Sequence, residues 1–339
     1  MIPKILAIIP EPWYMNVYAD YIARYLGDEF QIEVGSVPAA PYDHFQDRFP
    51  QIQLGCKNPD EYDLLWPVWP GYWGGIDRET YSHKMTPVLG MPNESPIDGV
   101  AVVGAASPVT ERSLAGKHFH SLRYGLDPEL FKPYPMVRDD DLLHVGMVGT
   151  IYNCKRAMNQ LFPYINNIPG TRIMFSTNHY IQRMTDLDLM GGWEARCAIV
   201  EAMKPWVTLP NTYNRLDVIL RTDQDPGISF PVIEAAACGV PCIATDCGID
   251  HIFTEAGGGI LIKADKVNSL GEGRSWYIEN VDEVGKRFRE AIVWMRDHQE
   301  ERKEMGRKAR EEILKNWTLE KVMPAWREFF REGMKNVKK

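Results

Sequence analysis

Short apolar runs alternate with stretches of helical periodicity along the whole chain. In the first half, the apolar runs predict strands at residues 4–9, 31–34, 63–68, 87–90 and 99–103, and amphipathic spacing predicts helices at 16–26 and 107–114. In the second half, strands are expected near 142–148, 172–176, 216–220 and 242–245, with helices between them. This alternation is typical of parallel sheets wound by crossover helices, so it predicts an α/β fold.

A polar, proline-bearing stretch, FKPYPMVRDDD at 131–141, separates the two halves and is interpreted as a linker with solvated charges. The sequence thus predicts one domain at 1–135, a second at 136–315 and a final helical segment at 316–339. In that last segment, four apolar residues recur at helical spacing and require a surface to cover: Val322, Trp326, Phe329 and Phe330. Two doubly wound domains leave a deep cleft at the carboxyl ends of their strands, where such sheets bind ligands.

The stretch GISFPVIEAAACGVPCIATDCG, at 227–248, divides into a turn, a short helix and a strand. Ser229 is placed to cap the helix and Pro231 fits its first turn, whereas Gly239 ends it. A helix N-terminus beside a sheet offers unpaired N–H groups that suit a phosphate or a sugar hydroxyl. Glu234 is then either a ligand-binding carboxylate or a charge that complements the helix dipole.

Composition narrows the class of protein. The 339 residues carry a net charge of −8, which argues against an undirected nucleic-acid binder. No apolar run approaches the roughly 20 residues that span a bilayer, and the chain is predicted to be cytoplasmic. Its six cysteines form no CxxC pair and suggest buried or free thiols in a reducing compartment, so no metal is expected.

Three segments resemble the retaining glycosyltransferases of the GT-B fold, in particular the family 4 group (glycosyl transferases group 1). They are the stretch at 227–248, the pair GVAVVGAASPVTERSL and LRYGLDPELFKPYP, and the C-terminal helices that end in WTLEKVMPAWREFF. The resemblance implies two Rossmann-like doubly wound domains facing a deep cleft. The first would be the acceptor side and the second the nucleotide-sugar side, with the last helix packing back on the first domain.

The implied activity is metal-independent transfer of a sugar from a nucleotide diphosphate sugar to an acceptor hydroxyl, with retention of configuration. That nucleotide sugar is a co-substrate, with a UDP-sugar favoured and a GDP-sugar next, and no further cofactor is implied. Pro226 stands where the family has its first glutamate, and Thr150 where it has an arginine. These two losses motivate an alternative, a nucleotide-sugar-binding protein of the same fold without transferase activity.

The resemblance also assigns the donor site. Glu234 fills the position of the family's second glutamate, which accepts hydrogen bonds from the nucleotide ribose. Lys155 matches the family's lysine, has Arg156 beside it, and would stabilise the departing diphosphate together with the Thr150 segment. Asp225 is the substitute expected for the missing first glutamate, which makes Lys155 and Asp225 the catalytic candidates. A turn presents backbone N–H groups to the sugar and distal phosphate: Gly227, Ile228, Ser229 and Phe230.

The acceptor side is less like the family. Aromatic side chains on or after two first-domain strands suit sugar rings or nucleobases: Trp13, Trp66, Trp69, Tyr72 and Trp73. The alternative is that Trp66 and Trp69 belong to the core, and Asn93 is a candidate by location only. Acceptors left open are a glycan, a lipid, a small molecule or, against the acidic charge, a hydroxymethylated DNA base. Peripheral membrane contact also stays open, and His118 with His120 are expected to flank a turn.

Overall fold

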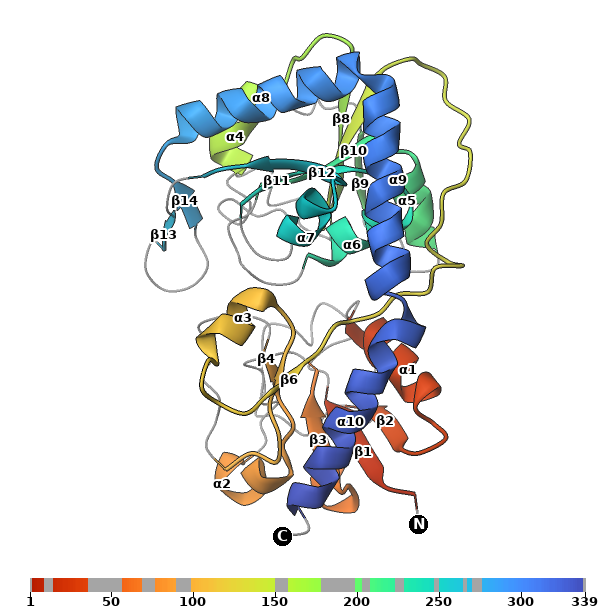
Figure 1. Ribbon diagram of the computed structural model, residues 1–339, viewed down its shortest axis with the longest axis vertical. Helices are drawn as coiled ribbons and strands as arrows, with labels where there is room; N and C mark the ends of the chain where they lie inside the picture. The colour runs from red at the N-terminus through yellow and green to blue at the C-terminus, as the bar shows by residue number, and fades with distance from the viewer. Residues whose placement is uncertain are drawn as a thin grey trace. The chain divides into compact units, whose positions relative to one another are not determined.

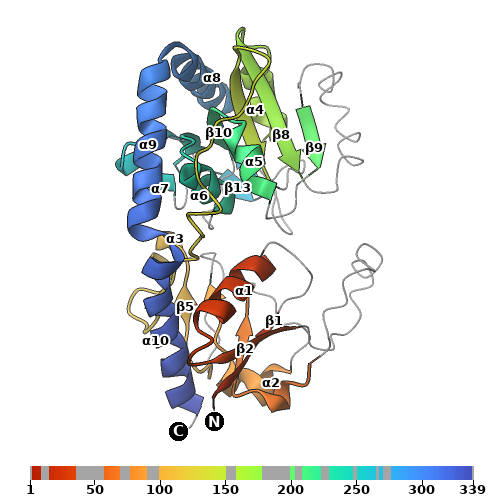
Figure 2. The same cartoon turned by 90° about the vertical axis from the view of Figure 1, so that its right-hand side faces the viewer.

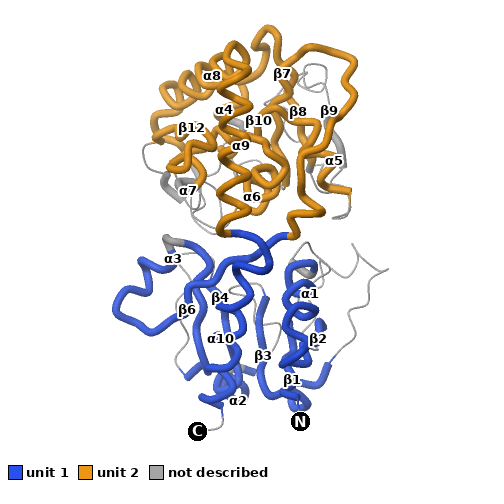
Figure 3. The backbone as a smooth tube through the Cα atoms, turned by 45° about the vertical axis from the view of Figure 1, so that its right-hand side comes forward, with its two compact units in different colours: residues 1–126, 317–339 blue, residues 127–316 orange. Residues whose placement is uncertain are grey.

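The computed structural model describes residues 2–8, 15–35, 57–68, 77–89, 99–149, 158–177, 199–202, 208–222, 229–246, 250–264, 267–269 and 276–337. The chain divides into two compact units, which Figure 3 colours separately. Unit 1 consists of residues 1–126 and 317–339, and unit 2 of residues 127–316. None of the described helices combines the length and the apolar character that crossing a bilayer requires.

Unit 1 contains two parallel three-stranded sheets, with strand orders β2-β1-β3 and β4-β5-β6. The strands are β1 (Lys4–Ile8), β2 (Gln31–Gly35), β3 (Leu64–Pro67), β4 (Val88–Leu89), β5 (Gly104–Ala105) and β6 (His120–Ser121). A parallel bridge between Leu65 and Met85, and a 2.9 Å hydrogen bond from Thr86 N to Leu65 O, join β3 to the segment before β4. The two sheets therefore form one layer. The strand predicted at 99–103 is wrong, because β5 begins one residue later.

The helices of unit 1 are α1 (Met15–Tyr25), α2 (Arg78–Tyr81), α3 (Pro108–Ser113) and α10 (Leu319–Val337), with 3-10 turns at Pro59–Glu61 and Ser82–Lys84. Helix α10 lies along the sheet (Figure 1). Its Trp326 ring lies 5.0 Å from that of Trp66 on β3, and its indole N–H donates a 2.7 Å hydrogen bond to Arg123 O. Phe330 adds edge contacts to Trp66 and Phe30. The apolar residues that recur at helical spacing in this helix thus form part of the core of unit 1.

Unit 2 is built on one six-stranded parallel sheet, with order β12-β11-β10-β7-β8-β9. Its strands are β7 (Leu143–Val148), β8 (Thr171–Thr177), β9 (Ile199–Ala202), β10 (Val218–Arg221), β11 (Cys242–Thr245) and β12 (Gly259–Ile262). Figure 2 shows β8 and β9 at one end of this sheet. An antiparallel hairpin of β13 (Val267–Ser269) and β14 (Trp276–Ile278) follows. Renumbered from β7, the sheet has the Rossmann order 3-2-1-4-5-6.

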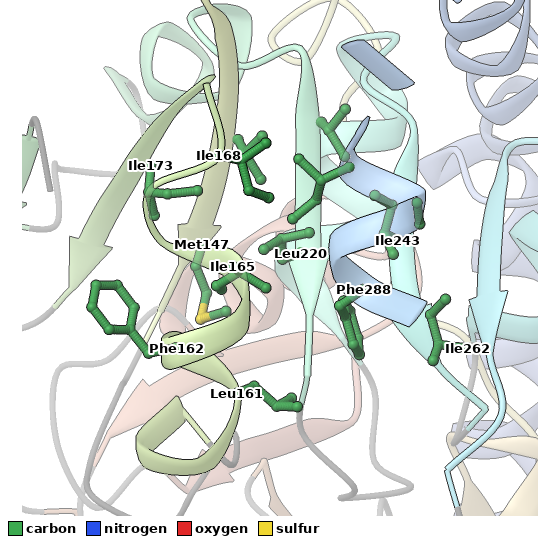
Figure 4. Packing of buried hydrophobic residues seen from close by; sticks show 14 of the residues in the cluster. Met147, Leu161, Phe162, Ile165, Ile168, Ile173, Leu220, Ile243, Ile262 and Phe288 are labelled. Atoms are coloured by element: carbon green, nitrogen blue, oxygen red, sulfur yellow. The ribbon is translucent and has the colours of Figure 1, made fainter. Parts of the chain in front are cut away.

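Helices cover both faces of that sheet (Figure 1). They are α4 (Met158–Ile165), α5 (Leu209–Asn214), α6 (Phe230–Ala237), α7 (Asp250–Glu255), α8 (Val281–Asp297) and α9 (Gln299–Asn316). On one face, α4 and α8 bury the main core cluster; Figure 4 shows Phe162 and Ile165 of α4 near Met147, and Phe288 of α8 near Leu220. Helices α5, α6 and α9 pack together on the other face.

The stretch at 131–141 is part of unit 2; Asp139 and Asp141 are exposed as expected, whereas Arg138 and Asp140 are partly buried in ion pairs. The Asp140 carboxylate lies 2.9 Å from His144 Nε2 and 2.5 Å from an Arg172 guanidinium nitrogen. Arg138 forms a 2.6 Å ion pair with Asp217. These ion pairs hold the stretch against the amino ends of β7, β8 and β10, and they account for Asp140 within the acidic run.

The end of α6 and the middle of α9 approach each other at the backbone. Gly239, with φ +78°, ends α6, and a Cβ on Gly306 of α9 would lie only 2.0 Å from Gly239 O. The Arg310 guanidinium, one turn further along α9, donates hydrogen bonds to Ala237 O at the end of α6 and to Phe131 O at 3.0 Å. A positive side chain at a helix C-terminus stabilises the exposed carbonyls there. Helix α9 therefore fixes the position of α6.

We expect Gly306→Ala to lower the free energy of unfolding by about 1–3 kcal/mol, because the added methyl must push two backbones apart and overpacking outweighs the helix propensity gained. Chemical denaturation measures this change. Gly27→Ala is the control, since its Cβ would meet ordinary contacts at 3.4 Å. Equal midpoints for the two variants would contradict the close approach.

We expect Trp326→Leu to lower the free energy of unfolding by about 2–3 kcal/mol, because it opens a cavity beside Trp66 and leaves Arg123 O without its donor. Tyr25→Leu, which removes an aromatic ring that is 44% exposed in the same unit, is the matched control. Denaturation followed by tryptophan fluorescence and by circular dichroism compares the two. A Trp326 variant as stable as the Tyr25 variant would show that α10 is not part of the core.

Candidate functional site

The strand order of unit 2 marks one place for a ligand. Strands β7 and β10 are hydrogen-bonded neighbours, and the chain continues from β7 to one side of the sheet and from β10 to the other. In open parallel sheets, ligands bind beyond the carboxyl ends of the two strands at this switch point. The segments that follow are 149–157 after β7 and 222–229 after β10. Both contain donor-site residues predicted from the sequence.

Helix α6 begins directly after the second of these segments. Ser229 occupies its N-cap position, as predicted, although its side chain makes no capping hydrogen bond. The Ser229 carbonyl accepts from Val232 N at 3.1 Å and from Ile233 N at 3.2 Å. Phe230 is buried, so its side chain belongs to the core and only its backbone is suited to a ligand. The helix N-terminus thus points its first N–H groups toward the switch point.

Glu234 is buried inside unit 2, with 2% of its surface exposed. Its carboxylate accepts a hydrogen bond from the hydroxyl of Tyr213, a buried residue of α5. Burial, followed by the charge of Glu234, raises the pKa of the Cys238 thiol one turn later to about 12. A buried carboxylate is costly, so it indicates a specific role for this side chain.

The dipole alternative for Glu234 is not supported. The residue is the fifth of α6, and the first turn of this helix contains no acidic side chain. Favourable interaction with the helix dipole falls off within that first turn and is small for an exposed side chain. The position and burial of Glu234 therefore favour a binding role.

Two buried polar residues at the carboxyl end of β10 were not identified from the sequence. Arg221, the last residue of the strand, is 2% exposed, and Thr222, the first residue of the second segment, is fully buried. The neighbouring Leu220 belongs to the core under α4 and α8, so alternation along the strand turns Arg221 toward the face that α6 covers. The sequence signal that could have identified Arg221 is a cation in an otherwise apolar strand, VILR.

The remaining predicted residues fall into two groups. The prediction that Trp66 offers a face to an acceptor is wrong, because it lies in the core of unit 1 with no exposed surface, as the alternative expected. The others lie outside the described residues, namely Thr150, Lys155, Arg156, Asp225, Gly227 and Ile228 of the donor set and Trp13, Trp69, Tyr72, Trp73 and Asn93 of the acceptor set. Within the described part of unit 2, no three His, Cys, Asp or Glu side chains converge as a metal site would require.

Comparison with known proteins gives one family match. Residues 177–280, from the end of β8 to the turn before α8, match the sequence model of a family described as glycosyl transferases group 1. No curated protein matches the chain.

Solved structures share the whole architecture. A glycosyltransferase from Rickettsia africae has 14% sequence identity and a TM-score of 0.68, with 99% of both chains covered. HepE from Anabaena, in complex with UDP and glucose, has 14% identity and a TM-score of 0.70 over 98% of this chain and 99% of that one. Sucrose-phosphate synthase from Thermosynechococcus elongatus has 13% identity and a TM-score of 0.69 over 98% of each chain. The chain has the GT-B fold, and the part of unit 2 that carries α6 and Glu234 matches the group 1 glycosyltransferase family.

Proposed function

We propose that this protein is a glycosyltransferase that moves a sugar from a nucleotide diphosphate sugar to an acceptor hydroxyl. The observation that carries the proposal is the buried carboxylate of Glu234 on α6, directly after the switch-point strand β10 and inside the family-matched segment. A UDP-sugar is the favoured donor and a GDP-sugar the next. HepE has been crystallised with UDP and with UDP-glucose, which supports this order.

Glu234 would bind the nucleotide ribose. An ionised carboxylate has two acceptor oxygens and no donor, so it can take both hydroxyls of a ribose at once. Tyr213 acts as a positioning residue, because its hydroxyl bonds one carboxylate oxygen and so fixes the plane of the group. Helix α5 thereby contributes to donor binding without touching the donor.

The diphosphate would lie across the carboxyl ends of β7 and β10. Lys155 and Arg156 follow β7, and the turn from Asp225 to Phe230 follows β10, so both segments flank the switch point. As the glycosidic bond breaks, the departing diphosphate gains negative charge. Cations and helix N–H groups placed in advance stabilise that charge without reorganisation.

The proposed reaction retains the anomeric configuration and needs neither a metal nor a cofactor in catalysis. The departing phosphate would help to deprotonate the acceptor hydroxyl on the same face of the sugar, so no protein nucleophile is required. Acceptors that fit are a glycan, a lipid at a membrane surface or a small molecule in the cytoplasm. The net charge of −8 weighs against a DNA base.

We expect Glu234→Gln to weaken UDP-sugar binding by about ten- to a hundredfold, because a charge-assisted hydrogen bond contributes about 1.5–3 kcal/mol. The amide keeps an acceptor for Tyr213, so the ligand-free melting temperature should change little. Isothermal calorimetry and thermal shift with UDP-glucose and GDP-mannose measure the difference. Glu255→Gln, at an exposed glutamate of unit 2, is the matched control. Unchanged affinity in the Glu234 variant would remove it from the donor site.

Lys155→Ala separates an enzyme from a binding protein. We expect the rate of sugar transfer, or the rate of donor hydrolysis where no acceptor is known, to fall at least about a hundredfold. Donor affinity should fall much less, because the cation acts mainly on the departing diphosphate. Release of the nucleoside diphosphate and proton NMR of the product measure rate and anomeric configuration. Tight donor binding without turnover on any acceptor would favour the inactive alternative that Pro226 and Thr150 suggest.

A further inference from the structure

Three side chains from distant parts of the sequence converge on the surface of unit 1. His118 and His120 belong to the segment that forms β6, and Glu332 belongs to α10, 212 positions after His120. One carboxylate oxygen lies 2.7 Å from His118 Nε2, and the other lies 2.9 Å from His120 Nε2. The three ligand atoms all lie within 4.8 Å of one another. The Nε2 atoms of both rings thus point at the Glu332 carboxylate.

The surrounding packing holds two of the three groups in place. His120 is partly buried and its ring makes an edge contact, at 5.7 Å between centroids, with Phe329, which lies one turn before Glu332. His118 is largely exposed, with 74% of its side chain accessible. An ion could therefore enter from solvent, and His118 is free to close around it with little cost to the core.

Charge near the cluster favours a cation. The arginines that share α10 pair elsewhere: Arg327 binds Asp28 and Glu29, and Arg331 binds Glu29. Glu332 is bonded to the two imidazoles, whose neutral form is itself a metal ligand. A half-buried carboxylate facing two ring nitrogens is the donor set that borderline divalent ions prefer.

We propose that His118, His120 and Glu332 bind a divalent transition-metal ion of the zinc class. A tetrahedral zinc ion with bonds of about 2.0–2.1 Å needs ligand atoms roughly 3.3–3.5 Å apart. The two N···O contacts, at 2.7 and 2.9 Å, are shorter than that spacing, so both rings must move slightly away from the carboxylate to admit the ion, and the exposed His118 ring moves most easily. Three protein ligands at the surface leave the fourth position to water.

The site ties the last helix to the sheet edge of unit 1. Because β6 is an edge strand of only two residues, a metal bridge to α10 stabilises a pairing that has few hydrogen bonds of its own. The ligands of this ion belong to unit 1, whereas the proposed donor residues belong to unit 2, and no step of the proposed sugar transfer uses the ion. This proposal departs from the expectation that the chain binds no metal, because the cluster joins two histidines to a glutamate 212 positions after His120.

The test uses the full chain without an affinity tag, under a reductant that does not bind metal. The protein is stripped with EDTA, and Zn²⁺ binding is measured by competition with a chromogenic chelator. We expect wild type to bind one zinc ion per chain tightly. The control His83→Ala, which removes an exposed histidine of the same unit, should bind one zinc ion with the same affinity. His118→Ala, His120→Ala and Glu332→Gln should each bind it at least about tenfold more weakly.

Melting of the same proteins gives the second measurement. Zinc should raise the unfolding midpoint of wild type and His83→Ala but not that of the three cluster variants. His118→Ala decides the question even if a more buried variant fails to fold, because its side chain is exposed. The proposal is overturned if zinc binding is absent, or if it survives unchanged in His118→Ala, and the cluster is then a hydrogen-bonded link only.

Discussion

The close approach of α6 and α9 is the constraint on which the donor site depends. Glycine at 306 lets the two backbones come within a distance that no side chain allows, Gly239 has the positive φ that ends α6, and Arg310 binds the Ala237 carbonyl at that end. Helix α6 has only eight residues and is too short to be stable in isolation. Its position, and with it the position of Glu234, is therefore set by α9 more than by its own sequence.

The order of the strands turns this local contact into a site. Since β7 and β10 are neighbours although two strands intervene in sequence, their carboxyl ends lie side by side at one edge of the sheet. In the sequence, Lys155 and Arg156 follow β7, and α6 follows β10. The proposed donor site therefore depends on the order of the strands and not on residues close in sequence.

Much of this arrangement was predictable where one helix or strand carries its own start and stop signals. The strand at 242–245 was placed to the residue, and Ser107 caps α3 through a 3.2 Å bond from Thr110 N as its sequence suggests. The two-residue strand β6 shows no period and was missed, whereas β4 lies within the strand predicted at 87–90. Trp66 was considered for the acceptor face as an aromatic residue near the end of a strand, with the core as the alternative. Because β3 is buried on both sides, its sequence has no alternation to decide between the two. The His118, His120 and Glu332 cluster depends on a pairing across 212 positions, which no local pattern contains.

Glu234 illustrates how function opposes stability within α6. Every other described residue of this helix except Pro231 is buried and apolar, and a carboxylate among them costs free energy that a leucine of similar volume would not. The hydrogen bond from Tyr213 offsets part of that cost, but it also raises the penalty of any change that removes only one partner. A chain selected for stability alone would have an apolar residue here. The proposed role of Glu234 accounts for the pair, because a ribose would need two acceptor oxygens held in a fixed position.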